Sequence, residues 1–285
     1  MSDLAVNLRA IPTPAKIGLA LIAVNLLAVL FAPLIAPYGE TDTVGGVWSP
    51  GIWSLDTPDV SPPAILGTDH LGRDLLSRLI YGARNTILLA IVITALSFTI
   101  GGLLGFLAAV LRGWVDQILS RTVDVLMAFP TLILALVVLS AMGTSTAVLI
   151  GVIATIDATQ IFRVSRALAR DIVVMEYFEA ARLRGERVWW LMVEEVLPNA
   201  LGPLVAEFGL RFCFVFLFIS ALSFLGLGIQ PPTADWGSMV RENAAAISFG
   251  MLIPLFPAFA IALLTIGINL VVDWFLQKSV GLKDG

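Results

Sequence analysis

The uncharged run TILLAIVITALSFTIGGLLGFLAAVL, from Thr86 to Leu111, indicates the fold class of this chain. A helix needs about 20 consecutive apolar residues to cross the hydrocarbon core of a bilayer. Gly101 and Gly105 form a GxxxG step within the run, which lets another helix backbone come close. Chance spacing in a glycine-rich helix explains the step equally well. We therefore predict a membrane-spanning helix here and leave the role of the two glycines open.

The composition of the chain supports the same class. Of its 285 residues 58% are hydrophobic and 13% charged, and the mean hydropathy is +0.94. Soluble domains carry about 25% charged residues, so these values exclude a soluble enzyme and a disordered chain. The net charge of −4 argues against nucleic acid as a partner. A single cysteine, Cys213, and a single histidine, His70, exclude an internal disulfide and any metal site built from several such ligands.

Six apolar segments predict six transmembrane helices, and hence an all-α, polytopic membrane protein. The first is expected to be retained, because it is longer than the apolar core of a signal peptide and lacks a cleavage pattern. The fifth carries Glu207 and Arg211, which are spaced as a helical ion pair. The predicted spans are 17–36, 86–111, 123–141, 146–163, 198–226 and 250–272.

Basic residues predict the orientation of these helices. With the N-terminus inside, twelve Lys and Arg residues fall in cytoplasmic segments and four in outer loops. The positive-inside rule then places both termini in the cytoplasm and residues 37–84 and 227–249 outside. Leucines at helical spacing over 71–80 predict an amphipathic helix that lies flat on the outer face of the membrane or on its own helix bundle, with Thr68 or Asp69 as its N-cap. His70 is expected to have a polar or capping role.

The inner loop between the fourth and fifth spans, about 163–199, is too long for a plain connector. It is expected to form two short helices on either side of Gly185, where glycine permits a positive φ. Ala180 and Ala181 are small and would leave room for something larger to pack closely. A basic connector and an element that docks onto a cytoplasmic partner are both compatible with this loop.

Residues of this loop resemble the EAA loop of ABC importer permeases. The pattern is Glu179-Ala180-Ala181, three residues, Gly185, and then Leu197-Pro198 at the family spacing. The family expects isoleucine where this chain has Glu195, and the neighbouring Val196 is the candidate for the apolar contact instead.

Three further segments narrow the resemblance to the dipeptide, oligopeptide and nickel permeases. Residues 67–78 look like their GTDxxGRDxxSR segment, and residues 121–130 are similar to their third-helix motif. Residues 223–239 resemble their outer loop before the last helix. The combined match covers about 67–239. It implies an N-terminal helix and first part of the outer loop at 1–66, a transporter core at 67–275 and a cytoplasmic tail at 276–285.

The resemblance implies a transport subunit of the bacterial inner membrane that is not itself an enzyme. The chain has no P-loop, so ATP and Mg²⁺ would be bound by partner subunits. The implied partners are a homologous second permease, two cytoplasmic ATPases, an extracytoplasmic solute-binding protein and the lipid bilayer. The implied cargo is a short peptide or peptide-like solute, with a nickel complex or other small solute as the alternative.

The resemblance also assigns three groups of residues by their motifs. Those expected to couple the chain to the ATPases are Glu179, Ala180, Ala181, Arg182, Leu183, Gly185, Leu197 and Pro198. Those expected along the translocation path or its gate are Asp124, Met127, Phe129, Pro130 and Phe224, to which the buried charge of Asp157, outside these motifs, is added. Those expected to contact the binding protein are Asp69, Arg73, Asp74, Gln230 and Trp236.

Two other classes of protein compete with this interpretation. A secondary transporter or channel would need no ATPase, but such proteins often carry inverted repeats and several buried charges, which the sequence does not clearly show. An intramembrane aspartyl protease would need Asp124 and Asp157 at the same depth. We expect Asp157 to pack against or pair with the neighbours Asp124 and Arg121, and a gating role is the alternative.

Overall fold

The structure is a computed structural model that describes residues 12–51 and 64–280, with side chains as far as Lys278. Two of the twelve basic residues expected in the cytoplasm, Arg9 and Lys283, lie outside the described residues, as do residues 52–63 of the predicted outer loop.

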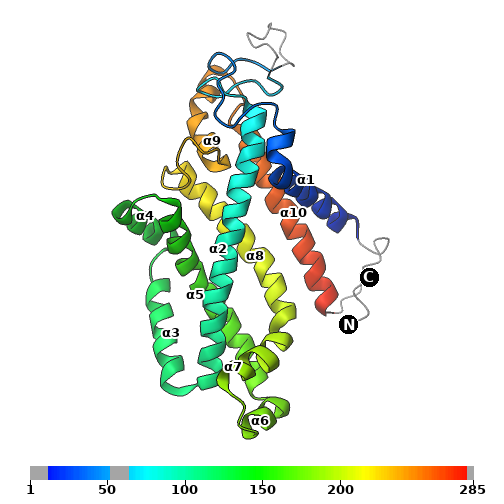
Figure 1. Ribbon diagram of the computed structural model, residues 1–285, viewed down its shortest axis with the longest axis vertical. Helices are drawn as coiled ribbons and strands as arrows, with labels where there is room; N and C mark the ends of the chain where they lie inside the picture. The colour runs from blue at the N-terminus through cyan, green and yellow to red at the C-terminus, as the bar shows by residue number, and fades with distance from the viewer. Residues whose placement is uncertain (1–11, 52–63, 281–285) are drawn as a thin grey trace. The chain divides into compact units, whose positions relative to one another are not determined.

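Every named element in the described ranges is a helix, and only two isolated bridges, Thr43–Arg73 and Thr68–Asp74, have strand geometry there. The helices appear in Figure 1. In chain order they are α1 (Thr13–Ile35), α2 (Leu75–Leu111), α3 (Gly113–Met127), α4 (Thr131–Met142), α5 (Thr146–Val173), α6 (Glu176–Leu183), α7 (Val188–Trp190), the π-helix η2 (Leu191–Val196), α8 (Leu197–Phe224), α9 (Trp236–Glu242), the 3₁₀-helix η3 (Ala244–Phe249) and α10 (Leu255–Val280).

Five helical stretches of the described chain are long and apolar enough to cross a membrane. They are α1, α2, α5, the stretch from α7 to the end of α8, and α10. The bent pair α3 and α4 would make the sixth span. The all-α membrane fold is therefore confirmed, with one of the six predicted helices broken.

The third predicted helix, 123–141, is wrong as a continuous element. α3 ends at Met127, α4 begins at Thr131, and the two helices meet at 86°. Pro130, at the N-cap of α4, explains the break, because proline lacks an N–H and disfavours helical geometry in the residue before it. Irregular backbone at membrane depth is tolerated only where protein buries it or a cavity adjoins it.

The predicted amphipathic helix over 71–80 is not a separate element. Its residues from Leu75 onward form the first turns of α2, which begins well before Thr86. Asp74, rather than Thr68 or Asp69, supplies the capping oxygen: its carboxylate accepts the backbone N–H of Ser77 at 2.7 Å. The cap lies here because a capping side chain must precede the first turn.

Two other helix bounds differ from the prediction. α5 continues to Val173 and shortens the loop that follows it. α10 begins at Leu255, later than the predicted 250, because η3 occupies 244–249 and ends at Gly250 with a positive φ of 77°. α10 then runs through the first residues of the predicted tail.

The chain forms two compact units whose boundaries fall inside α2 and α8. Unit 1 comprises residues 1–89 and 216–285, and unit 2 comprises residues 90–215. The division at 66 and 275 follows sequence motifs and stays a prediction. In unit 1, α1 packs on α10 through two glycines, since a methyl group at Gly18 would lie 2.5 Å from the carbonyl oxygen of Gly267.

In unit 2, α2 crosses α5 at the GxxxG step. A methyl group at Gly101 would lie 2.4 Å from the carbonyl oxygen of Ala158, and one at Gly105 would lie 2.8 Å from that of Phe162. The close-contact interpretation of the two glycines is therefore confirmed.

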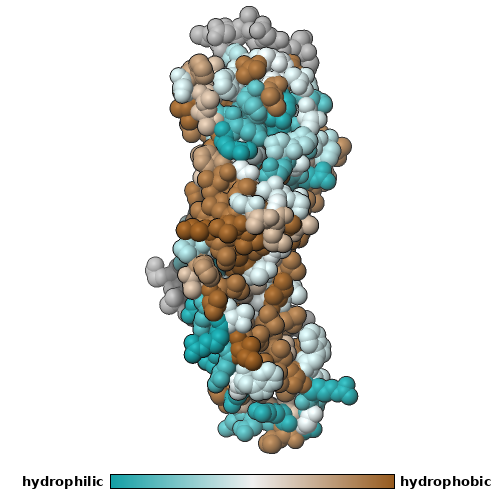
Figure 2. Space-filling model, turned by 90° about the vertical axis from the view of Figure 1, so that its left-hand side faces the viewer, coloured by the Kyte–Doolittle hydropathy of each residue, from teal (hydrophilic) through white to brown (hydrophobic). Residues whose placement is uncertain are grey.

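The surface of each unit is divided by polarity. Figure 2 shows hydrophilic residues at the loop-bearing end of unit 1 and at the α6 end of unit 2, with hydrophobic residues along the helices. Exposed apolar side chains such as Leu34 and Val137 suit contact with lipid.

The helix contact of unit 2 predicts that substitution by alanine destabilises the protein at Gly101 but not at the adjacent Gly102. Gly101→Ala forces its methyl group against backbone and should destabilise the protein by about 1–3 kcal/mol. Gly102→Ala is the matched control, because its methyl group would lie 3.9 Å from the nearest neighbouring atom, the hydroxyl of Ser165. Thermal unfolding of the purified variants in detergent measures the difference. Equal midpoints for the two variants would contradict the contact.

Candidate functional site

The hairpin of α6 and α7 is the first of three candidate regions. α6 ends at Leu183, Gly185 turns the chain with a φ of +82°, and Arg187 is the N-cap of α7. The short helix α6 and the positive φ confirm the prediction from sequence, whereas the expected second short helix is the beginning of a helical stretch that continues through η2 and α8. A methyl group at Gly185 would meet no atom within 4 Å, so the backbone conformation alone requires glycine there.

One face of α6 is anchored in the core of unit 2. Phe178 and Ala181 are both buried, in a cluster with Phe106 of α2, Ala169 of α5 and Leu204 of α8. The expectation that Ala181 leaves room for a partner is therefore wrong. Its small side chain lets α6 approach its own unit, because positions three apart lie on the same face of a helix.

The opposite face of α6 is open to solvent. Glu179, Ala180, Arg182 and Leu183 are exposed, and Leu183 at the turn is 83% exposed. Further exposed apolar residues surround the hairpin: Val174, Met175, Tyr177 and Trp189. The hairpin thus presents an apolar tip with charged flanks on a rigid support.

The C-terminal end of the predicted coupling motif packs into the hydrophobic core of unit 2. Val196 is fully buried in the same cluster, whereas Glu195 is half-buried, so the apolar contact does fall on Val196. Both residues lie in the π-helix η2, a type of turn that is common at functional positions. Leu197 packs against the cluster, and Pro198 is exposed.

An ion cluster on α5 and α8 is the second region. The Nε of Arg211 donates to Glu207 at 2.7 Å, which confirms the predicted helical pair. Another nitrogen of the same guanidinium lies 3.8 Å from the buried carboxylate of Asp157. The partner of Asp157 is therefore Arg211. The expected pairing with Asp124 and Arg121 is wrong, because α5 extends beyond its predicted end and Asp157 lies near its middle.

A cavity of about 260 Å³ adjoins this cluster, and its walls come from α3, α4, α5 and α8. Met127 and Asp157, both expected along the path, line it together with Arg211. The break between α3 and α4 lies at the cavity, where irregular backbone is tolerated.

The other residues expected along the path lie elsewhere. Asp124, Phe129 and Pro130 are exposed and do not line the cavity. Phe224 is exposed at the end of α8, in unit 1. Because Asp124 is exposed and Asp157 is buried, these two carboxylates do not form the shared site of an aspartyl protease.

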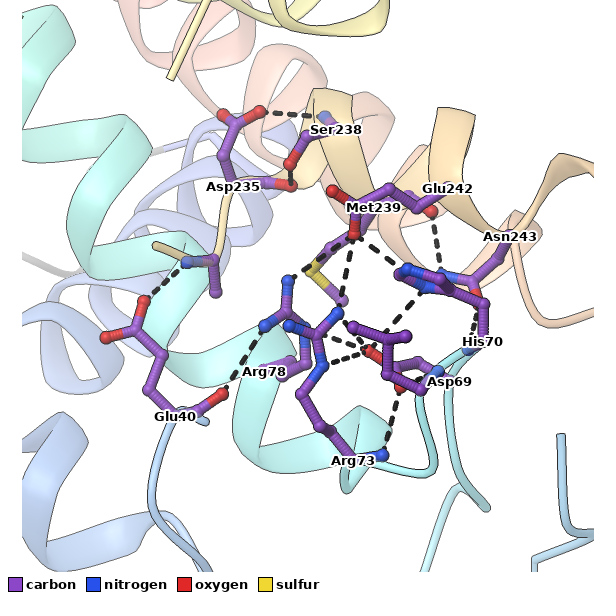
Figure 3. A network of polar contacts seen from close by, with 12 residues as sticks. Glu40, Asp69, His70, Arg73, Arg78, Asp235, Ser238, Met239, Glu242 and Asn243 are labelled. Atoms are coloured by element: carbon purple, nitrogen blue, oxygen red, sulfur yellow. Dashed lines mark hydrogen bonds and ion pairs between the residues drawn. The ribbon is translucent and has the colours of Figure 1, made fainter. Parts of the chain in front are cut away.

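A buried polar network in unit 1 is the third region (Figure 3). Asp69 accepts a hydrogen bond from Arg73 Nε at 2.7 Å and lies 3.3 Å from Arg78 Nε. Both guanidinium groups lie 3.6 Å from Glu242 of α9. The network fastens the loop before α2 to α9.

Most of the residues expected to contact a binding protein belong to this network or to its surroundings. Asp69, Arg73, Asp74 and Trp236 are buried, so the expectation of a surface contact is wrong for them. The indole of Trp236, for example, donates to the carbonyl of Leu79 at 2.9 Å. Gly82 beside it leaves space for the ring. Charged motif residues look like surface contacts in a sequence, whereas here they neutralise one another inside the fold.

Gln230 is exposed, and its side-chain amide donates to the carbonyl of Gly228 at 2.8 Å. Its expected contact with a binding protein stays a prediction.

Two titratable groups outside the membrane spans are shifted by burial. Burial lowers the pKa of His70, whose Nδ1 lies 3.8 Å from Glu242. Burial raises the pKa of Asp235, the N-cap of α9, although it accepts hydrogen bonds from Ser238 N–H and Thr86 Oγ1. Within the described ranges no group of three or more His, Cys, Asp or Glu residues could hold a metal ion.

Comparisons with known proteins agree with this architecture. The family described as "Binding-protein-dependent transport system inner membrane component" matches residues 101–279. The "Di/tripeptide transport system permease protein DppC" of Pseudomonas aeruginosa is 34% identical over 268 residues, or 94% of this chain and 85% of that protein. The "Glutathione transport system permease protein GsiD" of Pectobacterium atrosepticum is 34% identical over 219 residues, or 77% and 70%.

A more distant relative and a solved structure extend the comparison. The "Probable D,D-dipeptide transport system permease protein DdpC" of Escherichia coli is 32% identical over 255 residues, or 89% of this chain and 82% of that protein. A crystal structure of an amino acid ABC transporter with histidines has a TM-score of 0.50 at 19% identity, covers 71% of this chain and 94% of that one, and supports the fold alone. The chain therefore belongs to the family of binding-protein-dependent transport system inner membrane components, as a multi-pass membrane protein.

Proposed function

We propose that this chain is the permease subunit of an ABC importer for short peptides or peptide-like solutes and forms half of its translocation path. The α6–α7 hairpin carries the proposal, because it presents an exposed tip on a rigid anchor within a chain of this family. The relatives are named for di- and tripeptides, D,D-dipeptides and glutathione, which favours a peptide over the runner-up cargo, a nickel complex.

The partners follow from the proposed role. A homologous second permease completes the path, two ATPase subunits bind ATP and Mg²⁺, and an extracytoplasmic binding protein delivers the solute. The complex lies in the bacterial inner membrane with both termini of this chain in the cytoplasm. The basic residues of the loop between α5 and α8 support this orientation.

The contacts of the hairpin suggest how motion reaches the membrane. A cleft on the ATPase would receive the tip around Ala180 and Leu183. Phe178 and Ala181 join α6 to a core that includes Ala169 of α5 and Leu204 of α8. Close-packed interiors transmit displacement, so a shift of the hairpin would move the two helices that carry Asp157 and Arg211.

Substitutions at two adjacent alanines distinguish a role in docking onto the ATPase from a role in folding. Ala180→Trp should leave thermal stability unchanged and abolish ATPase association, because the new side chain lies on the exposed face. Ala181→Trp should lower stability by about 1–3 kcal/mol or more, because it overpacks the core. Thermal unfolding and detergent pull-down of the ATPase measure both effects. Full ATPase retention by Ala180→Trp would make the hairpin an ordinary connector.

The orientation predicts the accessibility of two introduced cysteines in a Cys213→Ala background. Gln230→Cys should react with an impermeant thiol reagent applied to the outside of intact cells. Leu183→Cys, on the hairpin, should react only after the membrane is opened. The reverse pattern of labelling would contradict the predicted orientation, because the hairpin would then lie outside the cell, where an ATPase has no access to cytoplasmic ATP.

The proposed cargo predicts saturable, ATP-driven uptake of labelled di- and tripeptides by the complex reconstituted with its binding protein. Nickel complexes are the comparison, and a complex with inactive ATPase is the control for leakage. Uptake of nickel complexes without uptake of peptides would reverse the ranking of the two cargoes.

A further inference from the structure

The carboxylate of Asp157 is buried without a well-formed hydrogen bond: the nearby Ser97 hydroxyl donates to the carbonyls of Ile93 and Ala154 instead. The residue is 2% exposed, and neither of its side-chain oxygens has a hydrogen-bond partner among the described residues. A buried charge is stable only when ion pairs and hydrogen bonds replace its lost hydration. Asp157 therefore lacks most of the partners that a carboxylate requires at this depth.

The nearest cation is engaged elsewhere. Arg211 is hydrogen-bonded to Glu207 at 2.7 Å, and its guanidinium lies over the ring of Phe214, 5.7 Å from the centroid. Its distance of 3.8 Å from Asp157 is too long for a hydrogen bond. With two carboxylates and one guanidinium, the cluster keeps a formal charge of −1.

Asp157 is one of the residues that line the cavity of unit 2. Thr131, Thr159 and Gln160 add polar side chains to the lining, and Met127 and Leu134 add apolar ones. At about 260 Å³ the cavity suits one end of a small organic molecule rather than a whole peptide.

We propose that this cavity binds a primary ammonium group, with Asp157 as its counter-ion and the neighbouring Thr and Gln oxygens as further acceptors. This inference rests on the proposed function, in which the ammonium is the amino terminus of the transported peptide. An ammonium has three N–H donors, which match the free acceptors of Asp157. The formal charge of the cluster disfavours an anion. A bound divalent metal would need several carboxylate or carbonyl ligands, and the described residues hold no suitable group.

Ligand-observed NMR on the assembled permease–ATPase complex in lipid nanodiscs tests the site without the binding protein. The probes are alanyl-alanine, N-acetyl-alanyl-alanine and n-propylammonium. We expect saturation transfer to alanyl-alanine and n-propylammonium, mutual competition between them, and at least about tenfold weaker binding of the acetylated peptide. Equal binding of the free and acetylated peptides by the wild-type complex would overturn the proposal without reference to any variant.

Three substitutions sharpen the test. Asp157→Asn should weaken binding of both amines at least about tenfold, whereas Asp157→Glu should retain most of it. Asp171→Asn, an exposed position on the same helix, is the control and should bind as the wild type does. Undiminished amine binding by a folded Asp157→Asn complex would overturn the site.

A measurement of peptide uptake distinguishes failure of this inference from failure of the proposed function. Peptide uptake by wild type, combined with amine binding that ignores Asp157, leaves the importer proposal intact and removes the ammonium site. Amine binding that requires Asp157, in a complex that takes up no peptide, keeps the site and removes the peptide as cargo.

Discussion

Arg211 holds Glu207 by a hydrogen bond and Asp157 at longer range, and the arrangement of unit 2 depends on this ion cluster. A charge in the bilayer interior costs about 2.5–3.5 kcal/mol on insertion scales, so α5 and α8 must lie close enough to bring opposite charges together. Gly101 and Gly105 then allow α2 to approach α5 at backbone distance. The break before Pro130 lies beside the cluster, and the result is a cavity lined by charged and polar side chains among apolar helices.

In the same unit, one packed core contacts both the hairpin and the helices that carry the ion cluster. Phe178 and Ala181 belong to a core that also includes Ala169 and Leu204, on the helices of the ion cluster. A force applied at Leu183 therefore acts on packed side chains rather than on a loose loop. The hairpin and the cavity are two ends of one packed body, as the proposed coupling of ATP hydrolysis to transport requires.

Unit 1 uses its charges differently. Asp69, Arg73, Arg78 and Glu242 neutralise one another below the surface (Figure 3). Asp235 caps α9 and accepts a hydrogen bond from Thr86. Charge-assisted hydrogen bonds of this kind define geometry more strongly than neutral ones. They attach the loop before α2 to α9, whereas Gln230 stays exposed.

The sequence alone determined the membrane class, the approximate spans, the Glu207–Arg211 pair and the turn at Gly185. These properties depend on local composition, helical spacing and the conformational freedom of one residue, all of which a sequence displays directly. Tertiary structure decided which motif residues face inward. Ala181, Val196, Asp69 and Arg73 are buried, whereas Ala180 and Gln230 are exposed and Glu195 is half-buried. It also decided that Asp157 pairs with Arg211. Burial and pairing depend on which helices meet across many intervening residues, and the spacing along one segment carries no information about the segment that will cover it.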